Sequence, residues 1–169
     1  DLAVGFTELK NNGELAGDTS DLQALLDVAW GSPDDAYAAD LEPILDVAAF
    51  LRGWALEGIV WHWDGYSYNT NNFYIYHRPD DDRLMFLPHG LDQLFQDVNY
   101  NVRYAPRGVL SARMYVDPAL EQRWEDAMRA ILDESWDEGA LLGRIDEAAD
   151  LIADVVEEDP RKFQSTDVQ

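Results

Sequence analysis

The most constraining feature of this sequence is an aromatic turn with a single acid, followed by carboxamides and two strand-like runs. The acid is Asp64, and the runs at 72–77 and 83–87 are rich in aromatic and aliphatic residues. Such runs favour β-strands, and the Pro- and Asp-containing segment 79–82 between them is typical of a hairpin turn. A second acid, Asp92, stands just past the end of the second run. The pattern predicts a β-hairpin flanked by an acid on either side.

The order of these groups is the one that kinase-type phosphoryl transfer uses. In that chemistry one Asp takes the proton of the attacking hydroxyl, and a downstream Asn and a later Asp hold the metal ions on the phosphates. Asp64 and Asn69 are five residues apart, which is the separation in kinase catalytic loops. The alternative is ordinary turn chemistry, because Asp and Asn side chains readily bind their own backbone in turns.

Residues 63–95 resemble the CotH (spore coat protein H) family of bacterial atypical protein kinases. The family has an Asp before a strand of the form Asn-Asn-aromatic-aromatic-Leu-Tyr, and residues 71–76 match it as Asn-Asn-Phe-Tyr-Ile-Tyr. A second family strand ends in Phe-Ile-Pro-Trp-Asp-Leu-Asp. Here His89 and Gly90 replace the Trp and the first Asp of that ending, whereas Asp92 keeps the second acid. If the first Asp is the indispensable metal ligand, the replacement puts activity in doubt.

The resemblance implies an α+β, mainly helical fold, similar to the large lobe of a kinase, with a short hairpin carrying the acids. We expect a single domain over 1–160 and a frayed tail at 161–169. Residues 6–10 resemble a short strand that closes a small lobe. The nucleotide-binding lysine of that lobe would lie before Asp1, so we expect this chain alone to be inactive.

The resemblance also implies a function. Full-length members would transfer the ATP γ-phosphate to Ser or Thr of surface or spore-coat-type proteins, with Mg²⁺ or Mn²⁺ as cofactor. This chain would then come from a bacterial protein that is secreted or belongs to the cell surface or spore coat. The alternative is a non-catalytic pseudokinase module that binds a basic protein partner or Ca²⁺ through its acidic face. A hydrolase using the same acids on a metal-bound water is a third, weaker alternative.

Asp64 is the candidate catalytic base of the predicted site. Asp92 is a candidate metal ligand; the alternative is that it is the N-cap of a short helix beginning at Gln93. A second ligand is expected from a carboxamide: the five-residue spacing favours Asn69, and the register with the aromatic strand favours Asn72.

Two further residues, Trp63 and His89, are expected to line the nucleotide pocket. A zinc site that uses His62 and His89 is disfavoured, because the sequence lacks the usual spacing of histidine ligands.

Composition narrows the classes of partner. The net charge of −22 disfavours nucleic acids and anionic membranes, and it favours divalent cations or basic proteins. No cysteine is present, which excludes disulfides and thiolate metal sites. No apolar run approaches the ~20 residues that a membrane span needs. The oligomeric state stays open.

Apolar periodicity and capping signals predict helices on both sides of the hairpin. A Ser20/Gln23 capping box predicts a helix to about Trp30, and a second periodic segment runs from Leu41 to Ala55. Asp117 and Pro118 begin a third helix, and a Ser135/Glu138 capping box begins a fourth, which runs to Glu158. The apolar stripes of these helices are predicted to be core.

Overall fold

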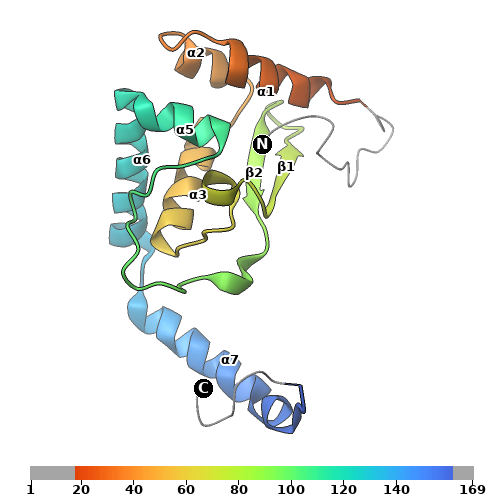
Figure 1. The fold of residues 1–169 in the computed structure, drawn as a ribbon, viewed down its shortest axis with the longest axis vertical. Helices are drawn as coiled ribbons and strands as arrows, with labels where there is room; N and C mark the ends of the chain where they lie inside the picture. Colours follow the sequence, from red (N-terminus) through yellow and green to blue (C-terminus); the bar gives the residue numbers. More distant parts are fainter. Residues whose placement is uncertain (1–17, 162–169) are drawn as a thin grey trace. The chain divides into compact units, whose positions relative to one another are not determined.

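A computed structural model describes residues 18–161 of the chain (Figure 1). The chain divides into two compact units, with the boundary between Leu132 and Asp133. Each unit is described here by itself, and the expectation of a single domain over 1–160 stays a prediction. The predicted strand at 6–10 and the tail from 162 onward lie outside the described residues.

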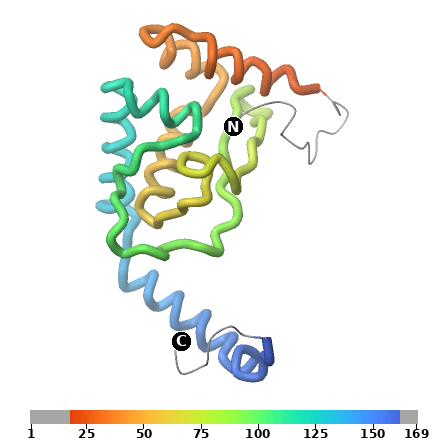
Figure 2. The backbone as a smooth tube through the Cα atoms, viewed as in Figure 1, coloured from red at the N-terminus to blue at the C-terminus, as the bar shows by residue number. Residues whose placement is uncertain are grey.

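The first unit consists of short helices around a two-stranded hairpin, which confirms the predicted α+β, mainly helical class. Its elements in chain order are α1 (Ser20–Gly31), α2 (Tyr37–Leu41), α3 (Val47–Ile59), α4 (Tyr66–Asn69), β1 (Phe73–His77), β2 (Leu84–Pro88), the 3-10 turn η3 (Leu91–Gln93), α5 (Val109–Val116) and α6 (Pro118–Ala130). A π-helical turn, η4 (Ile131–Ser135), follows α6. The trace in Figure 2 shows how the turn after α3 leads through α4 into the hairpin.

The hairpin forms where the sequence predicts it. β1 and β2 pair antiparallel, with Phe73 opposite Pro88 and His77 opposite Leu84. One face of the hairpin packs on α3, where the ring of Phe86 lies 5.1 Å from that of Phe50, measured between centroids. The hairpin is therefore anchored to the helix that leads into the Asp64 turn.

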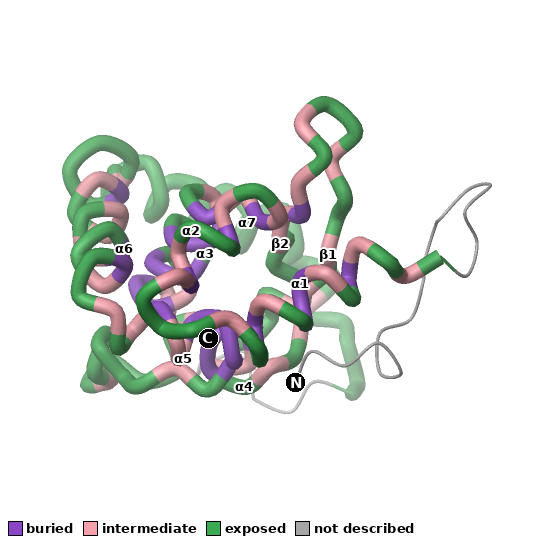
Figure 3. Tube along the Cα trace, turned by 90° about the horizontal axis from the view of Figure 1, so that it is seen from above, coloured by how far each residue is buried: buried purple, intermediate pink, exposed green. Residues whose placement is uncertain are grey.

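The part of the core that lies between α3 and α6 contains stacked aromatic rings. Trp54 stacks on Trp124 with 4.6 Å between ring centroids, and both side chains are almost fully buried. Buried positions recur along α3 and α6, as the apolar spacing of their sequences predicts (Figure 3). This packing fixes α3 as the rigid support for the segment that follows it.

The predicted helix from Leu41 to Ala55 is wrong at its start. The chain forms the short α2, breaks, and begins α3 only at Val47. Pro43 has no backbone N–H, so it cannot donate the hydrogen bond that would continue α2 beyond Leu41. Asp46 then caps α3 by accepting a hydrogen bond from the backbone N–H of Ala49 at 3.0 Å.

The capping predictions have mixed outcomes. Asp117 caps α6 as predicted, because its carboxylate accepts hydrogen bonds from the N–H groups of Ala119 and Leu120. Both capping boxes are wrong. Ser20 is the first residue of α1 rather than its cap, and α7 is capped by Asp137, whose carboxylate accepts a bond from Ala140. In both places another residue occupies the N-cap position.

The second unit contains α7 (Glu138–Glu158). The predicted burial of its apolar stripe is wrong, since α7 has no buried residue and Ile145 and Ile152 are exposed. The apolar periodicity of a sequence predicts that a helix is amphipathic, but it does not predict that a second element covers the apolar face. Within the described part of the chain, no helix is long and apolar enough to cross a membrane.

Candidate functional site

Asp64 is the centre of a cluster of carboxamides. Its Oδ1 accepts a hydrogen bond from Asn69 Nδ2 at 2.6 Å, and its Oδ2 accepts one from Asn72 Nδ2 at 2.6 Å. Asn71 Nδ2 also donates to Oδ2, at 3.1 Å. Asn69 and Asn72, which the sequence offered as alternatives for one position, therefore both converge on Asp64, together with Asn71.

These bonds fix how the carboxamides face. An ionised carboxylate only accepts hydrogen bonds, so each Asn must present its amino group to Asp64. The Oδ1 atoms of Asn69 and Asn72 are then left for other contacts. Carboxamide and carboxylate oxygens are ligands that hard divalent cations accept. The donor set around Asp64 thus fits a Mg²⁺ or Mn²⁺ ion chemically.

Unusual backbone conformations bring the carboxamides round to Asp64. Thr70, which ends α4, has a φ of 55°, and Asn72 has a φ of 45°. Both values lie in the left-handed region, where Asn is tolerated better than most residues because its short polar side chain can bind locally. The chain therefore reverses direction between Asn69 and β1, and both ends of the reversal face the same acid.

Gly90 forms the opposite wall of the cluster, just after β2. Its φ is 62°, and a β-carbon placed on it would lie 2.6 Å from both Cγ and Nδ2 of Asn72. The neighbouring residue, His89, donates its backbone N–H to the carbonyl of Asn72 at 3.0 Å. The end of β2 and the start of β1 are therefore in close contact at Asn72, and the space at position 90 is filled by the Asn72 side chain.

His62 lies buried behind the site, with 1% of its surface exposed. Burial lowers the pKa of His62, whereas the backbone groups of His89 and Asn72 and the charges of Asp64 and Asp92 oppose that shift. Its Nε2 is buried and makes no hydrogen bond.

Asp92 lies in the 3-10 turn η3 and is exposed. The N-cap of this turn is Gly90, without any side-chain capping bond, so the alternative role of Asp92 as an N-cap is wrong. The assignment of Asp92, Asn69 and Asn72 as metal ligands stays a prediction. Among residues 18–161, no group of three or more His, Asp and Glu side chains is arranged to hold a metal ion.

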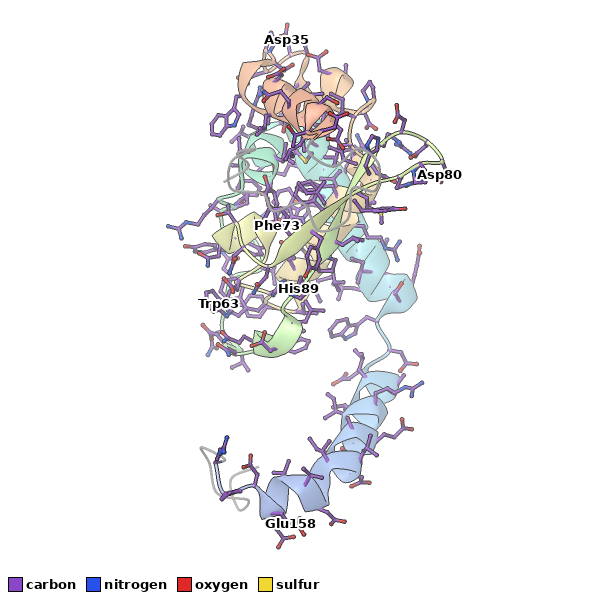
Figure 4. The ribbon with its side chains drawn as sticks, turned by 90° about the vertical axis from the view of Figure 1, so that its right-hand side faces the viewer. Asp35, Trp63, Phe73, Asp80, His89 and Glu158 are labelled. Carbon is purple, nitrogen blue, oxygen red and sulfur yellow. The ribbon has the colours of Figure 1, made fainter. Side chains whose placement is uncertain are left out.

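The two residues predicted for the nucleotide pocket lie near the hairpin (Figure 4). His89 packs against Tyr74 of β1, with ring centroids 4.7 Å apart. Trp63 is half-buried, and its indole Nε1 is buried without a hydrogen bond. Their role at a nucleotide stays a prediction.

Glu57 is a site residue that sequence reasoning missed. It lies in the last turn of α3, and its carboxylate accepts hydrogen bonds from the backbone N–H groups of Tyr66 and Ser67 at 3.2 and 3.0 Å. Burial raises its pKa to about 7, against the opposing effect of the bonds from Ser67 and Tyr66. A Glu among the apolar residues of α3 is the one signal that could have identified it.

Asp64 accepts a hydrogen bond from the carboxamide five residues downstream and lies beside an antiparallel hairpin. This arrangement is typical of a kinase-type large lobe. A family model described as CotH kinase protein matches residues 5–169. The chain therefore belongs to the CotH kinase family. No curated protein matches it.

Proposed function

We propose that this chain provides the catalytic acid and metal ligands of a CotH-type protein kinase, which transfers the ATP γ-phosphate to Ser or Thr hydroxyls. Membership of the family supports the class of reaction. The observation that carries the assignment of residues is the convergence of Asn69 and Asn72 on Asp64, each at 2.6 Å. Turn chemistry alone would have satisfied these side chains with backbone groups.

In this proposal Asp64 orients the substrate hydroxyl and accepts its proton. The carboxamides hold the carboxylate in one orientation, so that the acceptor atom is fixed before the substrate arrives, and such positioning is a large part of phosphoryl-transfer catalysis. Hydrogen bonds from three amino groups reach both oxygens of the Asp64 side chain.

Asp92 and the free Oδ1 of Asn69 or Asn72 would hold the divalent cation. When bound, the cation neutralises charge on the phosphates. Asp92 is exposed, in line with a ligand whose partner arrives with the nucleotide. His89 and Trp63 are assigned to the nucleotide side of the same site.

A pseudokinase module is the second candidate, and Gly90 is the observation that favours it. The position where the family has its first Asp here has no side chain and a φ of 62°. The Asn72 carboxamide occupies the space into which an Asp would project. In this alternative the acidic surface, with a chain net charge of −22, binds a basic protein or Ca²⁺.

Phosphoryl transfer by the full-length protein tests the proposal. We expect radiolabel from ATP, in the presence of Mn²⁺ or Mg²⁺, to appear on a Ser-rich basic protein. Asp64→Asn is expected to abolish transfer, since the carboxamide cannot accept the proton. Asp117→Asn is the control, because Asp117 caps α6 and takes no part in the site. If the wild-type protein transfers no phosphate with either metal, the pseudokinase alternative replaces the kinase proposal.

A further inference from the structure

The Glu57 carboxylate caps a helix to which it does not belong. The groups it binds, the N–H of Tyr66 and of Ser67, are the first two of α4. The first N–H groups of any helix lack partners within the helix, and the N-cap residue of α4, Gly65, has no side chain to supply one. The two backbone bonds go to different oxygens of Glu57, so the carboxylate acts as a two-point clamp.

The clamp closes directly beside Asp64. A β-carbon on Gly65 would lie 2.5 Å from Glu57 Oε1 and 2.7 Å from His62 Cδ2. Only glycine therefore lets both Glu57 and His62 come this close to the backbone at the residue after Asp64.

The other end of the clamped segment carries Asn69. Its backbone N–H donates to the carbonyl of Gly65 at 3.1 Å, and its side chain returns to Asp64 at 2.6 Å. The carbonyl of Ser67 is held in turn by the N–H groups of Arg107 and Gly108. A shift of α4 would thus separate Asp64 from the carboxamide five residues downstream.

The surroundings of Glu57 favour its neutral form. The carboxyl borders a small cavity lined by uncharged side chains, among them Phe50, Trp54, Phe73 and Phe86. The titratable groups that act on it or lie beside it are the phenols of Tyr66 and Tyr68 and the imidazole of His62. Burial raises the pKa of Glu57 to about 7. Only the ionised carboxylate accepts both N–H bonds with equal strength, because a protonated carboxyl keeps its carbonyl oxygen as an acceptor but turns the other oxygen into a hydroxyl donor.

We propose that Glu57 is the positioning residue of this site, and that its ionised carboxylate clamps residues 65–67 so that Asp64 and Asn69 face each other. The inference rests on the proposed function of the same site and deepens it. It assigns a role to a residue outside the family motif, and it makes the geometry at Asp64 depend on the protonation of a half-buried acid.

NMR of the chain tests the clamp without requiring activity. In the wild type we expect the backbone N–H signals of Tyr66 and Ser67 to shift together with pH, with a midpoint near the pKa of about 7. In Glu57→Gln that shift should disappear, and the side-chain signals of Asn69 and Asn72 should move. Glu42→Gln, which removes a surface carboxylate paired with Arg123, should leave all of these signals as in the wild type.

Two results would overturn the inference. One is a pH-dependent shift of the Tyr66 and Ser67 backbone N–H signals that persists in Glu57→Gln, and the other is that the substitution leaves the Asn side-chain signals unchanged. If Glu57→Gln does not fold, Glu57→Asp takes its place. It keeps the charge but is one methylene too short to reach both N–H groups, so the midpoint should move and the Asn signals should still shift.

Kinetics of the full-length protein separate the two proposals. Glu57→Gln should lower kcat about 10- to 100-fold, as expected for a displaced reacting group, while KM for ATP stays within about twofold. In the wild type, kcat should change with pH near pH 7, and this change should be absent from Glu57→Gln. A wild type without transfer contradicts the proposed function alone, because the NMR result still decides the clamp. Normal kcat in Glu57→Gln contradicts the positioning role alone.

Discussion

The β-carbon position of Gly90 lies 2.6 Å from the Asn72 carboxamide. The Asn72 side chain therefore fits in its place only because position 90 has no side chain. Asn72 in turn donates to Asp64 at 2.6 Å. The departure from the family pattern at Gly90 is therefore coupled to the hydrogen bonds of the candidate catalytic acid, and it is more than the loss of one carboxylate.

We expect Gly90→Ala to lower the free energy of unfolding by about 1–3 kcal/mol. A left-handed conformation costs a residue with a β-carbon about 1–2 kcal/mol, and the contact with Asn72 adds to it. Urea denaturation measures the change. Gly53→Ala is the matched control, because Gly53 lies in α3 with nothing within 4 Å of its β-carbon position. This second change should stabilise the protein by about 0.5–1 kcal/mol.

The contact between Gly90 and Asn72 can be isolated with a double-mutant cycle. In an Asn72→Ala background, Gly90→Ala should cost about 1 kcal/mol less than in the wild type, because the clash is gone and only the backbone strain remains. Additive costs would show that the two positions do not interact. For the same reason, Gly90→Asp alone should not raise phosphoryl transfer, since an acid at 90 must displace the Asn72 carboxamide.

Asp64→Asn should lower stability as well as abolish transfer. The substitution turns an acceptor into a donor that faces the amino groups of its Asn partners, and hydrogen bonds to charged groups contribute about 1.5–3 kcal/mol when they are buried. Asp64 is half-buried, so we expect a loss of about 1–2 kcal/mol. Asp92→Asn is the matched control. Asp92 is exposed, so the unfolding free energy of this variant should stay within about 0.5 kcal/mol of the wild-type value. Equal melting of the two variants would contradict the role of Asp64 as the centre of the cluster.

The three carboxamides should differ in importance. Asn69→Ala and Asn72→Ala each remove a 2.6 Å bond to Asp64, whereas Asn71→Ala removes one of 3.1 Å. We expect Mn²⁺ affinity of the chain to fall clearly in the first two variants and about twofold or less in the third, since Asn71 makes the longest of the three bonds to Asp64. Calorimetric titration measures the affinities. A larger loss in Asn71→Ala would reverse the assignment of ligands.

The hairpin could be predicted because its signals are local: strand-forming runs on either side of a Pro- and Asp-rich turn. The convergence on Asp64 could not, because it depends on the left-handed φ values at Thr70 and Asn72. The spacing favoured Asn69 and the strand register favoured Asn72. Neither signal contains the chain reversal that brings both side chains to Asp64. Glu57 escaped notice for a related reason, since its partners lie 9 and 10 residues further along the chain.

Stability should depend on pH through Glu57 in an unusual direction. Its pKa is raised from 4.5 to about 7 in the folded chain, mainly by burial. Between these two pH values the folded chain holds a proton that the unfolded chain has released, so stability falls as pH rises across this window. The shift corresponds to about 3 kcal/mol at 1.36 kcal/mol per pKa unit.

The difference in unfolding free energy between wild type and Glu57→Gln, measured by urea denaturation from pH 4.5 to 8, isolates this effect. Other groups titrate alike in both proteins, including His62, whose lowered pKa works in the opposite direction and removes stability as pH falls below 6.5. We expect the wild type to lose stability relative to Glu57→Gln up to about pH 7 and the difference to be constant above it. A constant difference over the whole range would mean that Glu57 is ionised throughout, and that burial does not outweigh its two backbone hydrogen bonds.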